Sequence, residues 1–154
     1  MTGHTRRRFL KITLAGACWG LLMALPRMAA AAWPAGAFRH KTVAGALNEL
    51  LGNANLTTAT DEVKITVTDL AENGSVVPVT IESRLANVDS IILFVDKNPS
   101  ALVARFNLAP NVRPFIKTNI KMAETSHVIA IAQSGGKLYS TKKKVKVVLN
   151  GCGG

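Results

Sequence analysis

The sequence has 154 residues and a mass of 16.4 kDa, the size of about one domain. Its net charge is +10, but five basic residues and no acidic ones lie in the first 32 positions, so the rest of the chain carries only +5. Aromatic residues make up 5%, which disfavours a base-stacking surface for nucleic acid, and the hydrophobic content of 48% is enough for a folded core.

The N-terminal segment has the features of an export signal. Residues 5–11 read Thr-Arg-Arg-Arg-Phe-Leu-Lys, which resembles the twin-arginine signal that exports folded proteins in bacteria. The apolar stretch Ile12–Leu25 is shorter than the ~20 residues that cross a bilayer, although a short membrane anchor is the alternative. Because Ala29–Ala32 fits a cleavage site, we expect residues 1–32 to be a signal peptide recognised through Arg6 and Arg7. The mature protein would then be periplasmic and free of the membrane.

After this segment the hydrophobic pattern changes from a helical to a strand period. Apolar residues recur at helical spacing over Ala37–Gly52, which predicts one helix with the glycine at its C-terminus. Alternation over Val63–Val67 predicts a half-buried strand. The pair Asn73-Gly74 is typical of a hairpin turn, since both residues tolerate a positive φ. Pro78 donates no backbone hydrogen bond, so we expect its strand at an edge or a bulge.

Further strand patterns, separated by turn residues, occupy the second half of the chain. The run Ser90–Val95 is apolar on both faces, which indicates either a central strand or a strand covered by a partner protein. Gly135-Gly136 predicts a turn before the last strand. About seven strands at short spacing predict an all-β fold, an immunoglobulin-like antiparallel β-sandwich with an N-terminal helix. The predicted strands cover residues 63–67, 77–81, 90–95, 102–108, 116–122, 126–133 and 137–149.

The last predicted strand separates positive charge from apolar side chains. Its lysines share one face and its valines and leucine the other, because side chains alternate along a strand. We expect the lysines to attract an anion and help stabilise a thiolate, with a merely solvated face as the alternative. The lysines are Lys142, Lys144 and Lys146, and the apolar residues are Val145, Val147 and Leu149.

The chain after Leu149 reads Asn-Gly-Cys-Gly-Gly. Glycines bring no side chains to a core and favour no single backbone region. We therefore expect residues 150–154 to form a flexible arm and residues 33–149 to form the folded domain.

Removal of the signal takes Cys18 with it and leaves Cys152 as the single cysteine of the mature chain. An internal disulfide is then excluded, and no metal or cofactor is expected. Nucleophilic catalysis needs a base fixed beside the nucleophile, whereas His40 and His127 are both distant from Cys152 in sequence. We interpret His127 as a core or face residue of its strand, and the thiol as an attachment point rather than a catalytic centre.

Several motifs occur together in one order along the chain. They comprise the twin-arginine signal, Ala71-Glu72-Asn73-Gly74 with Val77-Pro78-Val79, Asn98-Pro99, Thr125-Ser126 with Val128, and the ending Gly-Cys-Gly-Gly. In this order they resemble the SoxY family, the sulfur-carrier subunits of the bacterial thiosulfate-oxidising (Sox) system. The family usually ends in Gly-Gly-Cys-Gly-Gly. Asn150 stands in place of the first glycine, and asparagine also tolerates unusual backbone regions.

The resemblance implies a substrate carrier rather than an enzyme. Cys152 would hold sulfur derived from thiosulfate, and Gly151, Gly153 and Gly154 would give the arm its freedom. A SoxZ-like β-sandwich would form a stable heterodimer through sheet edges and apolar strand surface, with the run Ser90–Val95 as the apolar candidate. The SoxAX cytochrome would join thiosulfate oxidatively to the cysteine, and the SoxB hydrolase would remove sulfate.

Three other functions remain open at this stage. A carrier of the same build would serve a different sulfur donor or pathway. A thiol oxidoreductase is disfavoured because the mature chain lacks a second cysteine to resolve a mixed disulfide. In an exported structural or adhesive sandwich, the cysteine would be incidental.

We expect the replacement of both Arg6 and Arg7 by Lys to block export, because that pair is the recognised part of the signal. Cell fractionation should find the variant uncleaved in the cytoplasm, and the wild type cleaved between Ala30 and Trp33 in the periplasm. Arg8→Lys, at the variable position, is the matched control. Undiminished periplasmic accumulation of the double variant would show that another route is used.

Overall fold

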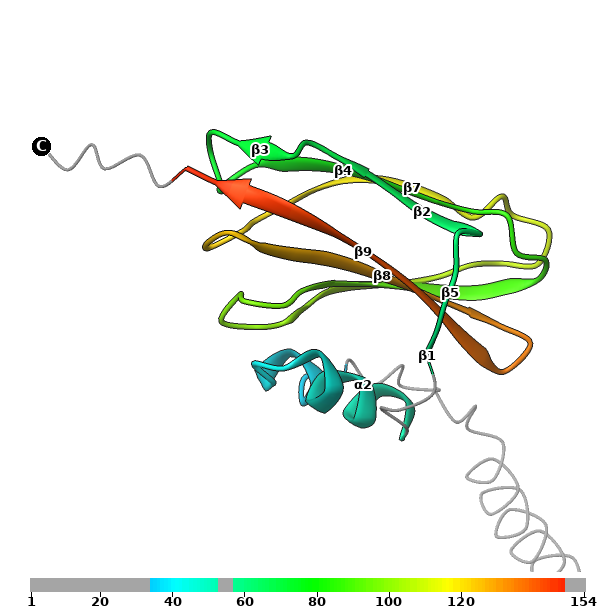
Figure 1. The fold of residues 1–154 in the computed structure, drawn as a ribbon. Helices are drawn as coiled ribbons and strands as arrows, with labels where there is room; N and C mark the ends of the chain where they lie inside the picture. The colour runs from blue at the N-terminus through cyan, green and yellow to red at the C-terminus, as the bar shows by residue number, and fades with distance from the viewer. Residues whose placement is uncertain (1–33, 53–56, 149–154) are drawn as a thin grey trace, which may run out of the picture. The chain divides into compact units, whose positions relative to one another are not determined.

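Two β-sheets pack face to face in the unit Pro34–Gly154 of the computed structural model, which describes residues 34–52 and 57–148 (Figure 1). The larger sheet has the order β1-β9-β8-β5-β6, with β3 beside β9, and the smaller sheet has the order β2-β4-β7. This arrangement confirms the predicted β-sandwich. The strands are β1 (Thr57–Ala59), β2 (Val63–Val67), β3 (Leu70–Ala71), β4 (Val77–Ser83), β5 (Val88–Val95), β6 (Leu102–Asn107), β7 (Phe115–Ile120), β8 (Ser126–Ser134) and β9 (Lys137–Val147).

The N-terminal helical segment is broken where one continuous helix was predicted. A 3₁₀ turn, η1 (Ala37–Arg39), precedes the α-helix α2 (Val43–Leu51). The break arises at Thr42, which has extended backbone angles and whose hydroxyl accepts a hydrogen bond from the backbone N–H of Gly45 at 3.2 Å. This N-cap begins a new helix there. Gly52 ends it in the left-handed region, as predicted.

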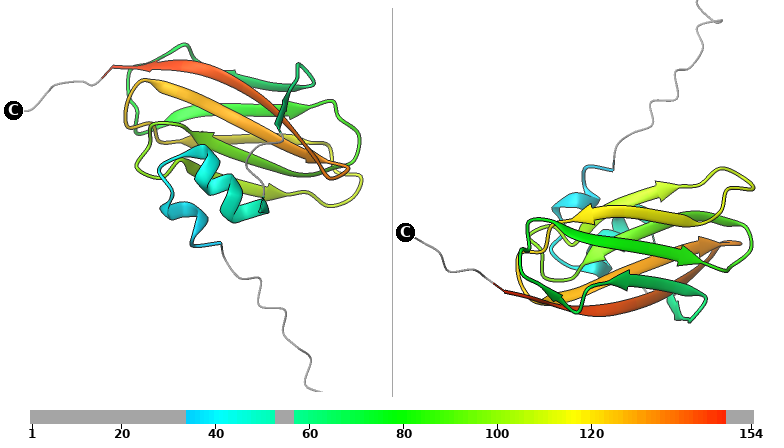
Figure 2. Two further views of the ribbon diagram at one scale, coloured as in Figure 1. Left: turned by 60° about the horizontal axis from the view of Figure 1, so that its bottom comes forward. Right: turned by 90° about the horizontal axis from the view of Figure 1, so that it is seen from above.

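Strand β5 lies in the middle of the larger sheet and is buried on both faces. Its residues from Ile91 to Val95 are completely inaccessible. One face packs against the smaller sheet, while Ile92 and Phe94 pack on the other face in a cluster with Ala46 and Leu47 of α2. Figure 2 shows the helix lying across this outer face. The central-strand interpretation is therefore confirmed. A partner protein does not cover this run, because the chain's own helix does.

Two short strands were not predicted from the sequence pattern. β1 and β3 have three and two residues, too few to show alternation, and both pair in parallel with β9. The described residues thus contain nine strands where seven were expected. The longer neighbours in both sheets pair antiparallel, and the predicted hairpin between β8 and β9 turns at Gly135 and Gly136, both with positive φ.

The pair Asn73-Gly74 is not a hairpin turn, which corrects the sequence prediction. Neither residue has a positive φ, and the strands before and after the pair belong to different sheets. The Asn73 side-chain oxygen accepts a hydrogen bond from the N–H of Ser75 at 2.8 Å. Gly74 is needed for close approach, because a Cβ there would lie 2.3 Å from the carbonyl oxygen of Met122. The segment therefore crosses between the two sheets. The backbone N–H of Met122, in the β7–β8 connection, donates a hydrogen bond to the carbonyl of Gly74 at 2.7 Å.

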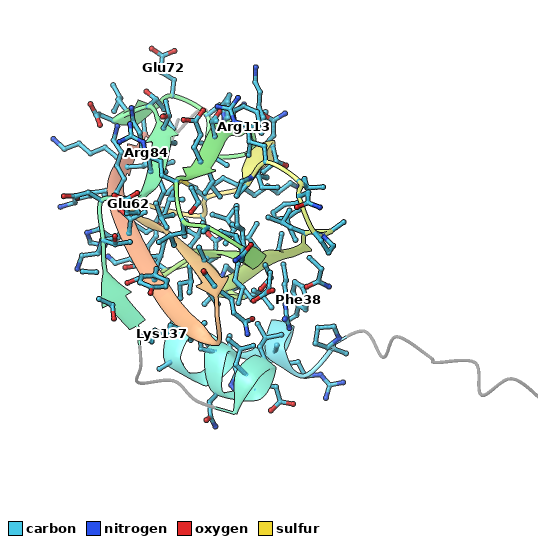
Figure 3. All side chains as sticks on the ribbon, turned by 90° about the vertical axis from the view of Figure 1, so that its right-hand side faces the viewer. Phe38, Glu62, Glu72, Arg84, Arg113 and Lys137 are labelled. Carbon is cyan, nitrogen blue, oxygen red and sulfur yellow. The ribbon has the colours of Figure 1, made fainter. Side chains whose placement is uncertain are left out.

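Side chains fill the space between the sheets, whereas Glu72 lies at the periphery with its carboxylate in solvent (Figure 3). The inner faces of β2 and β4 contribute alternating buried residues, in agreement with the predicted strand periodicity. The prediction that the strand of Pro78 lies at an edge or carries a bulge is wrong, because β4 is the middle strand of the smaller sheet and its pairing has no register shift. Pro78 is accommodated because β2 pairs with β4 only from Val79 to Ser83.

We expect Gly74→Ala to lower the free energy of unfolding by about 1–3 kcal/mol, because its Cβ meets backbone that has little freedom to move. Urea unfolding followed by circular dichroism measures the loss. Gly136→Ala is the control: its φ of 74° adds left-handed strain, but no atom lies within 4 Å of the new Cβ. If the urea midpoint of Gly74→Ala equalled that of the wild type, the close approach would be refuted.

Candidate functional site

The predicted arm, residues 150–154, and the predicted signal pair Arg6 and Arg7 lie outside the described residues, as does Leu149. The structure instead defines how the chain is held up to Val148, the last described residue. There, Val148 donates its N–H to the carbonyl of Ala71 at 3.0 Å, and Val147 donates to the Thr125 hydroxyl at 3.0 Å. Backbone hydrogen bonds therefore hold the chain up to Val148.

A lysine for which the sequence predicted no role strengthens this attachment. Lys143 is half-buried on β9, and its Nζ donates to the carbonyl of Val67 at 2.8 Å and lies 3.1 Å from Oδ1 of Asp69. The backbone N–H of Lys146 donates to the carbonyl of Asp69 at 2.9 Å. The connection between β2 and β3 is thereby tied to the last strand by a side chain and by main chain.

The three lysines predicted to share a face do so. Lys142, Lys144 and Lys146 are all exposed, whereas Val145 between them is completely buried in the core. Within the described residues no carboxylate forms an ion pair with any of the three. These lysines, named the basic stripe below, therefore present unneutralised positive charge along β9 toward Val148, the last described residue.

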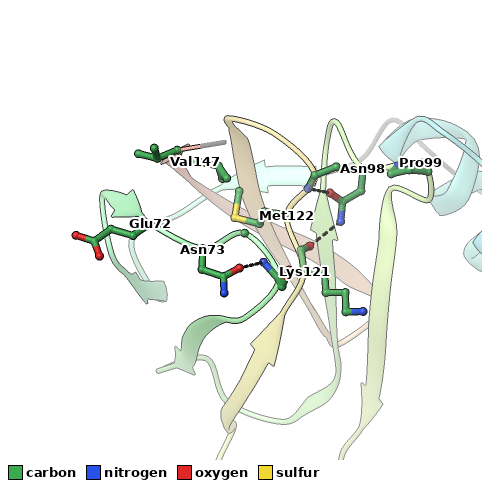
Figure 4. A pocket seen from close by; sticks show the side chains of 11 residues that line it. Glu72, Asn73, Asn98, Pro99, Lys121, Met122 and Val147 are labelled. Carbon is green, nitrogen blue, oxygen red and sulfur yellow. Dashed lines mark hydrogen bonds between the residues drawn. The ribbon is translucent and has the colours of Figure 1, made fainter. Parts of the chain in front are cut away.

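Motifs far apart in the sequence meet at this same end of the sandwich. A cavity of about 660 Å³ lies there (Figure 4). The Asn98 side chain joins two of its walls, because its Nδ2 donates to the carbonyl of Lys121 at 2.8 Å and its Oδ1 accepts from the N–H of Ala123 at 2.9 Å. Val147 and Val148, the last described residues, therefore line a hollow built by three connections. Its lining comprises Glu72, Asn73, Gly74, Ser75, Asn98, Pro99, Lys121, Met122, Ala123, Val147 and Val148.

A histidine–carboxylate pair also lies at this end. Nδ1 of His127 is 3.0 Å from Oδ2 of Asp96, and the backbone N–H of His127 donates to Oδ1 at 2.8 Å. Burial raises the pKa of Asp96. The hydrogen bonds from His127, with the charges of His127 and Lys97, outweigh that effect, so the pKa lies below its ordinary value of 3.8. His127 is a half-exposed strand residue, and sequence spacing gave no sign of its acidic partner.

Two negative observations apply to residues 34–52 and 57–148. No group of three or more His, Cys, Asp or Glu side chains is arranged to hold a metal ion there. In the same ranges, no helix has the length and the apolar character that a membrane crossing requires.

Comparisons with known proteins agree with the geometry. Residues 47–152 match the family model of the sulfur oxidation protein SoxY. The sulfur carrier protein SoxY from Chlorobium limicola f thiosulfatophilum is 32% identical, with a TM-score of 0.57 over 62% of this chain and 88% of that one. Superoxide reductase (neelaredoxin) from Ignicoccus hospitalis is 17% identical, with a TM-score of 0.52 over 58% of this chain and 82% of that one, which shows a shared fold alone. No curated protein sequence matches significantly.

We expect Asp96→Asn to lower the free energy of unfolding by about 1 kcal/mol near neutral pH, because it removes a charge-assisted hydrogen-bond acceptor. A carboxylate whose folded pKa is lowered contributes stability above its ordinary value of 3.8, and this stability is lost as the pH falls through the lower folded value. The difference from wild type should therefore shrink in strong acid. Urea unfolding of wild type and variant, from neutral pH down to below 3.8, measures this difference. Replacement of the exposed Asp89 by Asn is the control. A difference in unfolding free energy that did not change with pH would contradict the stabilising role of the ionised Asp96 carboxylate.

Proposed function

Because the chain belongs to the SoxY family of sulfur oxidation proteins, we propose that it is a periplasmic sulfur carrier that holds thiosulfate-derived intermediates on the thiol of Cys152. The observation that carries this proposal is the family match, which extends to Cys152 and ends there. A thiolate attacks sulfur readily and retains it as a covalent adduct. Joining thiosulfate to the thiol forms an S–S bond and releases one proton and two electrons, which the SoxAX cytochrome would accept.

The attachment of β9 supports a movable arm on a fixed base. Main-chain hydrogen bonds hold the strand up to Val148, and Cys152 follows four residues later. At ~3.3–3.6 Å per residue, the thiol can reach about 13–14 Å from that point. Gly151, Gly153 and Gly154 give this segment its freedom and leave room around the sulfur for a narrow active site. In this proposal residues 1–32 are the export signal, 33–149 the carrier domain and 150–154 the arm.

The partners follow from the same proposal. A SoxZ-like sandwich forms a stable heterodimer, and SoxAX and SoxB dock transiently to act on the arm. Since Ser90–Val95 is buried within the chain, the SoxZ-like subunit binds elsewhere. The edges of the two sheets are available: β6 and β7 each pair on one side only among the described strands, and Phe115 on β7 is 41% exposed.

The basic stripe supports electrostatic guidance of these transient partners. Exposed charges of one sign raise the encounter rate with a surface of opposite sign. The stripe leads to the base of the arm, so an acidic surface that docks on it brings its active site within reach of Cys152.

We expect Cys152→Ser to abolish thiosulfate-dependent reduction of cytochrome while leaving the melting temperature unchanged, because the serine hydroxyl forms no sulfur adduct. Intact mass measurement of periplasmic protein should find the adduct on the wild type and not on the variant. Cys18→Ser is the control, because that cysteine leaves with the signal. Persistent electron transfer in a strain whose only copy carries Cys152→Ser would refute the carrier role.

We expect reversal of the basic stripe to Glu to slow the reaction with partner enzymes severalfold at low salt. The loss should shrink as salt increases, since the screening length falls from about 10 Å at 0.1 M to about 3 Å at 1 M. Cytochrome reduction rates measured across this range provide the test. The control reverses Lys64, Arg84 and Lys117, which are exposed on or beside the smaller sheet. A loss that is equal at all salt concentrations would mean that the stripe is only a solvated face.

A further inference from the structure

Of the two sheet edges named above, β6 is protected by the fold. Its pairing with β5 shifts register between Leu93 and Phe94, and η1 lies against it. The N–H of Ala101, directly before β6, also donates to the carbonyl of His40 at 3.0 Å. Irregular pairing and covering elements are common means by which proteins keep a sheet edge from recruiting another strand. β6 is therefore a poor template for an added strand.

Strand β7 is regular and open by comparison. It pairs with β4 along its whole length, Phe115–Ile120, without a register shift, and it contains no proline. Among the described strands, its other side has no partner. The opposite edge of the smaller sheet differs, because β2 lies against β9 and the carbonyl of Val67 accepts the hydrogen bond from Lys143. The fold thus leaves β7 as an edge that can accept a further strand.

The backbone of this edge directs hydrogen-bonding groups outward at Lys117 and Asn119. Ser83 donates its N–H to the carbonyl of Pro114 at 3.0 Å, in the register of the β4–β7 pairing. Because hydrogen-bonded pairs alternate along an antiparallel ladder, every second residue of β7 from Ile116 onward bonds β4. Lys117 and Asn119 therefore direct their N–H and C=O groups away from the sheet, where an added strand would bond them.

The side chains on the outer face of this edge carry positive charge at every fourth residue. Arg113, Lys117 and Lys121 share this face by alternation, and all three are exposed. Phe115 and Asn119 lie between them. The guanidinium of Arg113 lies 5.5 Å from the ring centroid of Phe115, a cation–π distance, so this contact holds the first charge beside the strand. We name Arg113, Lys117 and Lys121 the basic edge.

Nearby acidic groups neutralise little of this charge. Oε1 of Glu82 lies 3.9 Å from Nη2 of Arg113, whose side chain is 80% exposed. In the part of the chain that the structure describes, no carboxylate forms an ion pair with Lys117 or Lys121. The edge of β7 therefore combines outward backbone groups with positive side chains that are open to a partner.

This charge pattern disfavours a second copy of the chain as the partner. Antiparallel pairing of two β7 edges centred on Lys117 would place that residue opposite its own copy, and Arg113 opposite Lys121. Like charges directly opposite each other destabilise a strand pair, and lysine on an edge strand is a common means of preventing self-association. A strand with a carboxylate at every fourth residue would instead place an acidic side chain opposite each basic one.

We propose that the edge of β7 binds an extended, acidic strand of another protein, which adds one strand to the smaller sheet. Backbone hydrogen bonds at Lys117 and Asn119 supply affinity, and carboxylates opposite the basic edge select the partner. Burial of Ile120 in the core fixes the register of β7, so the edge is preformed. The inference goes beyond the proposed function, because it involves neither Cys152 nor sulfur chemistry.

The test measures binding of a fluorescent peptide, Glu-Thr-Val-Thr-Glu-Thr-Val-Thr-Glu, to the full chain by fluorescence anisotropy. Its glutamates recur at every fourth position to match the basic edge, and its sequence reads the same in both directions, which suits either strand orientation. We expect Asn119→Pro to weaken binding about tenfold, because proline removes an outward N–H and leaves a peptide carbonyl unpaired. Binding to the wild type should weaken as salt increases, because salt screens the carboxylates from the basic edge.

Asn107→Pro is the matched control, because it places the same change on the edge of β6. Leu108 donates its N–H to the carbonyl of Asp89 at 2.9 Å, so the N–H of Asn107 points away from β5. This variant should bind the peptide as the wild type does, and circular dichroism verifies that both proline variants are folded. Equal affinities of the two proline variants would overturn the proposal.

A charge exchange tests the same edge without proline. Reversal of the basic edge to Glu should abolish binding of the glutamate peptide and create binding of a peptide in which lysine replaces each glutamate. The proposal is wrong if the wild type does not bind the glutamate peptide, or if the reversed variant binds it equally well. A dimer of the free protein that Asn119→Pro dissociates in sedimentation would assign the edge to a second copy instead. The assay contains neither thiosulfate nor cytochrome, so its failure would leave the carrier role of Cys152 intact.

Discussion

Strand β9 is held by hydrogen bonds along both edges, and the rest of the candidate site depends on this ladder. β8 pairs with it antiparallel from Ser126 to Ser134, while β1 and β3 pair with it in parallel on the other side. The Lys143 contacts with Val67 and Asp69 add a side-chain tie near the end of the strand. Because this attachment continues to Val148, the fold sets the position of the last described residue.

Residues from three connections meet at the same end of the sandwich and contact one another there. Gly74 admits the Met122 backbone at a distance that no side chain would allow, and Asn98 joins the β5–β6 connection to the β7–β8 connection. Thr125 binds Val147 directly. These residues, which first suggested the family, form a frame around Val147 and Val148, the last described residues. They do so through hydrogen bonds to backbone groups and through close packing.

Much of this protein is determined by local sequence pattern. The period of two placed the longer strands and their buried faces, Gly52 and Gly135-Gly136 marked a helix end and a hairpin, and the basic stripe was read from alternation alone. Such features are local, because side-chain direction in a strand repeats every two residues. The candidate attachment residue is also a matter of sequence, because Cys152 is the single cysteine after the predicted signal, residues 1–32, and stands among glycines.

Other features depended on contacts between distant residues, which no local pattern contains. The apolar run of β5 fitted a partner-covered strand equally well until α2 was found packed on Ile92 and Phe94. β1 and β3 exist only because β9 offers them backbone partners, since two or three residues carry no period of their own. Asn73-Gly74 had the composition of a hairpin turn, but the approach of Met122 gives it the role of a sheet crossing. In the same way, His127 acquires Asp96 on one side and Lys144 on the other only through strand register, which is a property of the assembled sheet.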